Sequence, residues 1–176
     1  MIGLLVSSLM VRSFFVFSSV FGFFCDLENN TVELIGDGSD KVSFTRRSDI
    51  GYVLAKALED ETIRSKGGAM AMQGDFQSFQ DAVQLLGKTL GKDITITYKD
   101  PQEALKEEQA LLAKGMEGDI GAFYGSFKLH LMGEPARGNT GCDLSESYHN
   151  YGVSMQSLEQ VFASGVYGPP AADKKE

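Results

Sequence analysis

The stretch that decides the fold is Val32-Glu33-Leu34-Ile35-Gly36-Asp37-Gly38, followed by Val42-Ser43-Phe44-Thr45 and then by Asp49-Ile50-Gly51. In the first two pieces apolar and polar residues alternate, which is typical of strands with one buried face. The glycines at 36 and 38 predict a tight hairpin turn between them. We therefore expect strand, turn and strand over residues 31–45, and a helix after them.

The helix after this unit is predicted over residues 48–58. Ser48 can cap its N-terminus, and Asp49 in the first turn complements the positive end of the helix dipole. Apolar residues recur at helical spacing and predict a single buried face: Ile50, Val53, Leu54, Ala57 and Leu58.

The rest of the chain alternates predicted strands and helices, which favours an α/β fold with a partly parallel sheet. The number of strands is small for a complete doubly wound domain, so the pattern resembles the second half of one. We predict a buried strand at 69–72 and a further strand at 94–98. Between and after them we predict a helix at 79–90, capped by Ser78 and ended by Gly91, and a helix at 101–114 capped by Asp100. A further helix starts at Asp119, with an inner face of Ile120, Phe123, Tyr124, Phe127 and Leu131; a loop follows from Gly133 to Tyr151, and then a short helix with Leu158, Val161 and Phe162. We divide the chain into a hydrophobic segment (1–25), an α/β region (26–166) and a disordered tail (167–176).

Composition excludes some classes of function. The chain has 16 basic and 24 acidic residues and a net charge of -8, so we expect no nucleic-acid partner, because phosphate binding needs clustered basic residues. Two cysteines (Cys25 and Cys142) and two histidines (His130 and His149) show no metal-ligand spacing. We therefore expect no metal.

The segment Met1–Phe24 carries a single charge, Arg12, and six of the chain's 12 phenylalanines. A signal peptide lacks support because no positive charge precedes the apolar run. A membrane span has the required length but would place Arg12 near its centre, which costs about 2.5–3.5 kcal/mol. A segment that packs against further protein, or a misassigned start, is the interpretation we favour. We thus expect a cytoplasmic protein, with membrane attachment through 1–24 as the weaker alternative.

The sequence contains no complete catalytic or nucleotide-binding motif. Gly36-Asp37-Gly38 has no third glycine and leads into a strand, whereas a dinucleotide loop leads into a helix. Gly67-Gly68 precedes a predicted strand. Tyr52 and Lys56 fit the Tyr-x-x-x-Lys spacing of short-chain dehydrogenases, a spacing that is common by chance. His130 is interpreted as a partly buried structural residue in preference to a base.

The ordered pieces GDG (36–38), VSFT (42–45) and DIG (49–51) resemble those of NmrA-like proteins, an atypical short-chain dehydrogenase/reductase branch that includes isoflavone reductases. The later helices and strands agree in order, and the resemblance covers about residues 26–162. The residues of these pieces are most similar to those of fungal members of the family. The resemblance implies the C-terminal part of an NAD(P)-binding Rossmann-like fold with a small, mostly helical substrate-side subdomain.

The resemblance also implies functional residues. Thr45 and Asp49 would bind at the mouth of the cofactor and substrate cleft, although a helix-start role explains Asp49 as well. Phe123, Tyr124 and Phe127 would line an apolar substrate pocket, although core packing also explains them. Catalytic residues stay unknown.

The family's glycine-rich NAD(P) loop has no counterpart in this sequence. We therefore expect a truncated oxidoreductase-like protein that acts on a small molecule, does not retain NADP(H) or NAD(H), and is inactive alone. The alternative is a non-catalytic NmrA-like regulatory or binding module that acts through a protein partner or self-association.

Overall fold

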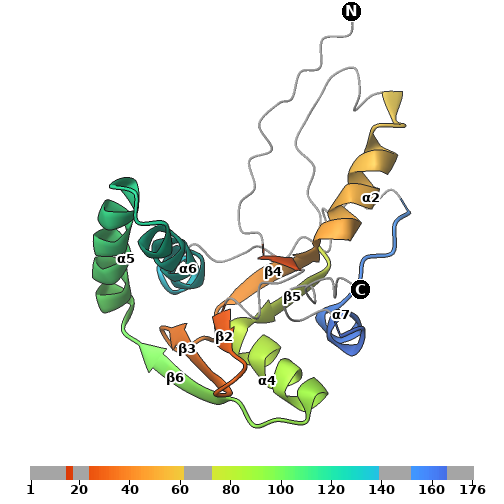
Figure 1. Ribbon diagram of the computed structural model, residues 1–176. Helices are drawn as coiled ribbons and strands as arrows, with labels where there is room; N and C mark the ends of the chain where they lie inside the picture. Colours follow the sequence, from red (N-terminus) through yellow and green to blue (C-terminus); the bar gives the residue numbers. More distant parts are fainter. Residues whose placement is uncertain (1–14, 18–23, 62–72, 139–151, 166–176) are drawn as a thin grey trace, which may run out of the picture.

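The computed structural model describes residues 15–17, 24–61, 73–138 and 152–165. The strand predicted at 69–72, the tail predicted to be disordered and most of the segment 1–24 lie outside these ranges. Within them, helices and strands mix as expected for an α/β fold (Figure 1).

The strands of the described ranges form two three-stranded sheets. The first has the order β1-β4-β5, with β1 at Phe15–Phe17, β4 at Lys41–Arg46 and β5 at Asp75–Ser78. Strand β4 runs parallel to β1 and antiparallel to β5. Strand β1 lies inside the hydrophobic N-terminal segment, where we predicted no strand.

The second sheet has the order β2-β3-β6, with β2 at Cys25–Asp26, β3 at Thr31–Ile35 and β6 at Thr95–Lys99. Strand β3 pairs antiparallel with β2 and parallel with β6. The predicted strands at 31–35 and 94–98 are thus confirmed to within one residue.

The predicted hairpin between β3 and β4 is wrong, because these strands belong to different sheets. The turn at Gly36 and Gly38 does form, and both glycines have the left-handed φ values of 71° and 70° that favour glycine. The Gly36 amide donates to the Lys99 carbonyl at 3.0 Å and so extends the β3–β6 ladder. Since β2 and β6 occupy both edges of β3, the chain leaves this sheet after the turn and enters the other.

Helices α4 (Phe79–Leu90) and α5 (Pro101–Met116) match the predictions closely. The Ser78 hydroxyl accepts the Asp81 amide, and Gly91 ends α4 with a left-handed φ of 64°. Asp100 caps α5 by accepting the amides of Gln102 and Glu103. The predictions of these helix ends were correct because each capping residue lies within a few residues of the backbone groups that it caps.

Helix α2 (Arg47–Ala57) departs from its prediction. Arg46 occupies the N-cap position without a side-chain cap, and Ser48 lies inside the first turn. Val53 and Ala57 are buried, whereas Leu54 and Leu58 of the predicted face are exposed. The helix projects from the end of β4 (Figure 1), so only part of its apolar face meets protein.

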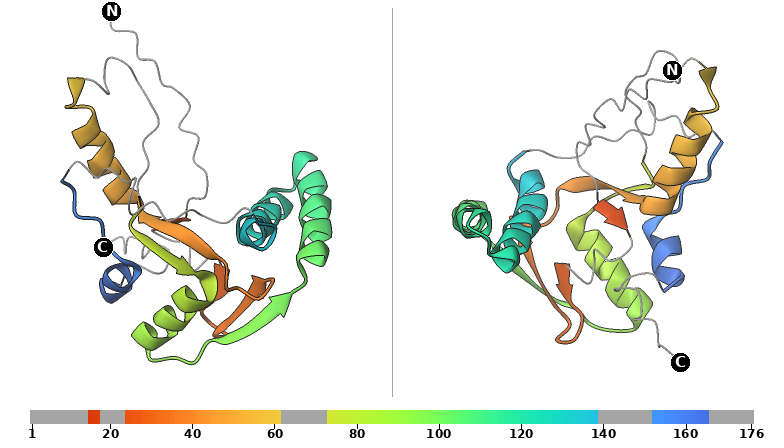
Figure 2. Two further views of the ribbon diagram at one scale, coloured as in Figure 1. Left: turned by 180° about the vertical axis from the view of Figure 1, so that it is seen from behind. Right: turned by 45° about the horizontal axis from the view of Figure 1, so that its top comes forward.

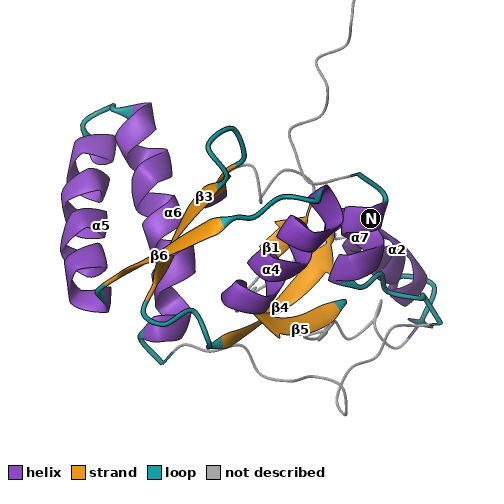
Figure 3. Cartoon of the chain, turned by 90° about the horizontal axis from the view of Figure 1, so that it is seen from below, coloured by secondary structure: helices purple, strands orange, loops and turns teal. Residues whose placement is uncertain are grey.

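Helix α6 (Ile120–Ala136) begins with Asp119 as its cap and extends three residues beyond the predicted end at Gly133. It packs against α5 and on β3, and Figure 3 shows the two helices side by side. Its buried positions are Ala122, Ser126, Leu129, Met132, Gly133 and Pro135. The buried face of α6 is therefore opposite to the face that we predicted to be buried.

The core joins both sheets through α4. The Phe79 ring makes edge contacts with Phe24 at 6.0 Å and with Phe44 at 5.8 Å, measured between ring centroids. Phe44 belongs to β4, and Phe24 directly precedes β2. Helix α7 (Leu158–Ala163) completes the core by burying Leu158, Val161 and Phe162, as predicted.

The cap of α4 yields a test of local stability. We expect Ser78→Ala to lower the free energy of unfolding by about 1 kcal/mol, because the Asp81 amide loses its acceptor. Ser48→Ala on α2 is the matched control and should change it by less than about 0.5 kcal/mol, since Ser48 is exposed, caps no helix and donates only a long bond of 3.3 Å to Asp49. Urea unfolding measures both, and equal losses would contradict the assignment.

The buried Cys25 thiol yields a pH test. Burial raises its pKa from 9.0 to about 11, and the positive charge of Lys128 offsets only part of this effect. Between these values the unfolded chain loses the thiol proton while the folded chain keeps it, so stability falls as pH rises. We expect wild type to lose about 2 kcal/mol relative to Cys25→Ala between pH 8.5 and 11. Parallel stability curves for the two proteins would refute this.

Candidate functional site

The carboxyl edge of β1 and β4 is where this fold would be expected to hold a ligand. Because the two strands are parallel, their ends at Phe17 and Arg46 share one edge, and α2 begins there at Arg47. In open α/β sheets ligands bind outside the carboxyl ends of strands. The predicted cofactor residues Thr45 and Asp49 lie on either side of this junction.

Both residues are buried and already engaged. The Asp49 carboxylate accepts the Gln156 backbone amide at 2.9 Å and the Ser48 hydroxyl at 3.3 Å. The Thr45 hydroxyl oxygen accepts the Gly74 amide at 3.4 Å. These partners are parts of the protein itself, so the structure gives both side chains a role in holding distant segments together.

Residues that sequence reasoning missed complete this polar cluster. Arg46 donates through Nη1 to Oε1 of Gln156 at 2.5 Å. Asp75 accepts the Leu158 amide at 2.9 Å. Two carboxylates, Asp49 and Asp75, therefore fasten the segment before α7 to the end of the β4–β5 sheet. No local signal in the sequence points to contacts that span 107 and 83 residues.

The glycines of the described chain do not form a dinucleotide cradle. A Cβ at Gly36 would lie 3.0 Å from the Ala136 methyl, and one at Gly38 would lie 2.7 Å from Cδ1 of Leu34. Close packing and left-handed backbone thus account for both glycines. The turn also leads into β4 and not into a helix, so the residues present do not fit a pyrophosphate.

The predicted substrate residues lie together on α6, away from the first cluster. Phe123, Tyr124 and Phe127 are 45%, 56% and 47% exposed, so the core-packing interpretation is wrong for them. The first two rings make an edge contact at 6.1 Å between centroids. The neighbouring exposed apolar side chains are Leu112, Met116 and Ile120. We call these six residues the α5–α6 apolar face.

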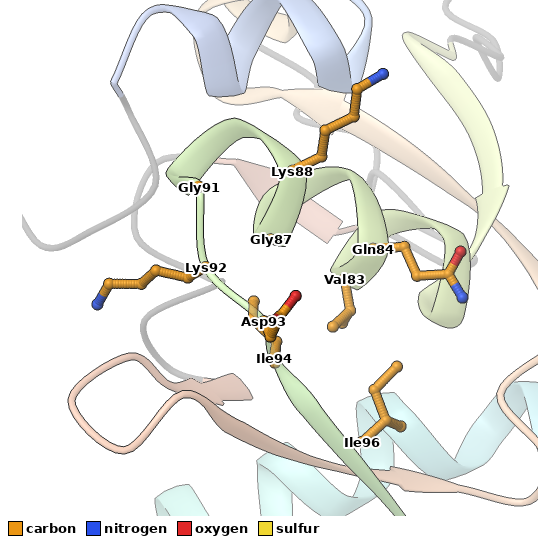
Figure 4. Close-up of a pocket in the computed structure, with 9 residues that line it drawn as sticks. All are labelled: Val83, Gln84, Gly87, Lys88, Gly91, Lys92, Asp93, Ile94 and Ile96. Atoms are coloured by element: carbon orange, nitrogen blue, oxygen red, sulfur yellow. The ribbon is translucent and has the colours of Figure 1, made fainter.

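The two sets of predicted residues are not brought into one site. Figures 1 and 2 show α2, which carries Asp49, and α6, which carries the predicted substrate residues, on opposite sides of β4. A third place, a cavity of about 410 Å³ between α4 and β6, contains none of the predicted residues. Val83, Ile94 and Ile96 line it, and Lys88 and Lys92 extend away from it (Figure 4).

The geometry gives little support to the remaining candidates for catalysis or metal binding. Tyr52 is 63% exposed, and Lys56 forms an ion pair with Glu59 at 3.0 Å. Among the described residues, no group of three or more His, Cys, Asp or Glu side chains could hold a metal ion. In the same ranges no helix combines the length and apolar character needed to cross a membrane.

The Asp49 carboxylate yields a test of the polar cluster. We expect Asp49→Ala to lower the free energy of unfolding by about 2 kcal/mol, because the partly buried Gln156 amide loses its acceptor. Hydrogen exchange should accelerate in residues 156–162 more than in α5. Asp93→Ala, at an exposed position before β6, is the control and should change neither quantity. Unchanged exchange in the Asp49→Ala variant would show that the cluster does not hold this segment.

Comparisons with known proteins bear on the identity of this fold. No protein-family model matches the chain. It is 31% identical over 78 residues to an isoflavone reductase-like protein of Olea europaea, which is 44% of this chain and 25% of that protein. It is also 31% identical over 74 residues to eugenol synthase 2 of Clarkia breweri, which is 42% of this chain and 24% of that protein. The matches thus span about a quarter of the relatives' length.

A solved structure extends the likeness to the fold. The binary complex of leucoanthocyanidin reductase with NADPH from Vitis vinifera matches 87% of this chain with a TM-score of 0.60 and 14% identity. The match covers 50% of that reductase. The chain therefore has the Rossmann-like α/β fold of that reductase, and part of its sequence is similar to isoflavone-reductase-like proteins.

Proposed function

We propose that residues 26–166 form the C-terminal, substrate-side part of a fungal-type, NmrA-like, NAD(P)-dependent oxidoreductase-like protein. On this proposal the chain alone is inactive, because none of its glycine clusters suits a coenzyme phosphate loop. The reductase relatives and the match to half of an NADPH-binding reductase support the assignment. The cytoplasm is the compartment we propose.

The observation that carries the proposal is the α5–α6 apolar face. Six large apolar side chains exposed within residues 112–127 are unusual for a folded protein surface, and such a patch marks a binding site or an interface. A substrate-side subdomain needs this property, since its aromatic side chains must face the coenzyme and the ligand. Phe123, Tyr124 and Phe127 would then contact the substrate.

The substrate class follows from the same side chains. Flat aromatic rings on α6 suit a small aromatic molecule, because aromatic pairs gain energy beyond the burial of area. The names of the relatives, an isoflavone reductase-like protein and a eugenol synthase, point to the same class. Thr45 and Asp49 would shape the coenzyme side of the site by holding the end of β4 and the start of α2 in place.

A second candidate function is a non-catalytic regulatory or binding module. The α5–α6 apolar face would then dock on a protein partner or on a second copy of the chain, and no coenzyme would be needed. Light scattering at high protein concentration separates the two forms of this candidate. A dimer that dissociates in Phe123→Ser would support self-association, whereas a monomer leaves only the partner.

The coenzyme test uses the chain as it is. We expect titration calorimetry with NADPH to show no binding to the purified chain, because the glycine turns of the described residues form no backbone-amide site for the pyrophosphate. Full-length leucoanthocyanidin reductase, solved with NADPH, is the positive control. Micromolar binding of NADPH to this chain would contradict the proposal, and binding of NADH alone would contradict it equally.

A further inference from the structure

A cluster of ionisable side chains joins α5 to α6 beside the α5–α6 apolar face. Nδ1 of His130 lies 2.9 Å from Oε1 of Glu108, and Nη1 of Arg137 lies 3.1 Å from Oε2 of the same carboxylate. The Glu108 and Arg137 side chains are only 12% and 14% exposed. The guanidinium charge pairs with this largely buried carboxylate, although Nη1 and Oε2 make no hydrogen bond, and Oε1 is the oxygen that accepts from the imidazole.

This arrangement decides which ring nitrogen of His130 is free. A carboxylate can only accept, so a neutral imidazole must donate its proton from Nδ1 and keep the lone pair on Nε2. Nε2 has no hydrogen-bond partner among the described residues, and the side chain is 50% exposed. Glu134, the other acid nearby, lies 3.8 Å from Nδ1 and is bound by Arg137 at 2.6 Å. The Nε2 lone pair is therefore not used within the described chain and can accept a hydrogen bond from a ligand.

The imidazole continues the aromatic surface of α6. Phe123, Phe127 and His130 follow at spacings of four and three residues, which places them on one side of a helix. The three side chains are similarly exposed, at 45%, 47% and 50%. The two phenylalanine rings therefore lie on the same side of α6 as Nε2 of His130, a hydrogen-bond acceptor. The contact between Glu108 and Nδ1 sets the orientation of this imidazole.

We propose that His130 is a ligand-contacting residue whose Nε2 accepts a hydrogen bond from a hydroxyl of an aromatic ligand lying on Phe123 and Phe127. Glu108 is the positioning residue, and Arg137 keeps its carboxylate in place. The inference rests on the proposed substrate-side role of α6 and goes beyond it, because it assigns the acceptor and requires a hydroxyl on the ligand ring.

The tautomer of His130 tests the positioning role. We expect ¹⁵N-edited NMR of the wild type above neutral pH to show a protonated Nδ1 and an unprotonated Nε2 for His130, with His149 as the second signal and His130→Leu as the assignment control. Glu108→Ala should return the ring to the mixture of tautomers seen in unstructured peptides. Glu107→Ala is the matched control, because Glu107 binds Lys99, and it should change nothing. A wild-type ring protonated at Nε2 would overturn the proposal.

A pair of simple probes tests the ligand contact. 4-Methylphenol and 4-methylanisole differ in whether the ring oxygen carries a proton. We expect 4-methylphenol to shift the Nε2 signal, and His130→Leu to weaken its binding about fivefold while leaving 4-methylanisole unaffected. Phe127→Ala should weaken both probes equally. Equal effects of His130→Leu on the two probes, or no binding of 4-methylphenol to the wild type, would overturn the proposal.

These experiments use no coenzyme, so they fail independently of the proposed reductase assignment. NADPH binding to the chain would contradict that assignment and leave the His130 result standing. A wrong tautomer would remove the role of His130 and leave the assignment standing.

Discussion

The packing of Phe79 between Phe24 and Phe44 is the interaction on which the rest of the structure depends. It gives the two small sheets a common core, because one neighbouring ring lies on β4 and the other directly precedes β2. Within the described ranges the two sheets share no hydrogen-bonded strand, and side-chain packing through α4 connects them. Helix α7 adds to this core and is itself tied to the β4–β5 sheet by Asp49 and Asp75.

This core explains where functional surface is left. Leu129 and Met132 of α6 face inward, so the opposite side of the helix must carry Phe123 and Phe127 outward. On α2 the buried apolar side chains are Val53 and Ala57, which lie outside the core cluster around Phe79. The large apolar side chains that stay exposed in the described chain therefore lie mainly on α6, α2 and the end of α5, and the largest group lies on the α5–α6 hairpin.

Local features were predictable from sequence, and long-range ones were not. The caps at Ser78, Asp100 and Asp119 involve neighbours three residues away at most, so the sequence pattern contains both partners. Alternation predicted β3 and β4 as strands but could not name their partners, which explains the wrong hairpin. Helical spacing grouped the α6 aromatics correctly, yet it could not reveal that their face points to solvent. The Asp49–Gln156 contact depends wholly on the folded core.

The outward orientation of the α6 aromatic residues is the central claim, and solvent paramagnetic relaxation tests it most directly. A soluble gadolinium chelate should broaden the ring signals of Phe123, Tyr124 and Phe127 strongly, because about half of each side chain is exposed. The ring of Phe79, which is 5% exposed, should be affected little. If the three α6 ring signals were broadened as little as that of Phe79, the outward orientation of these rings would be contradicted.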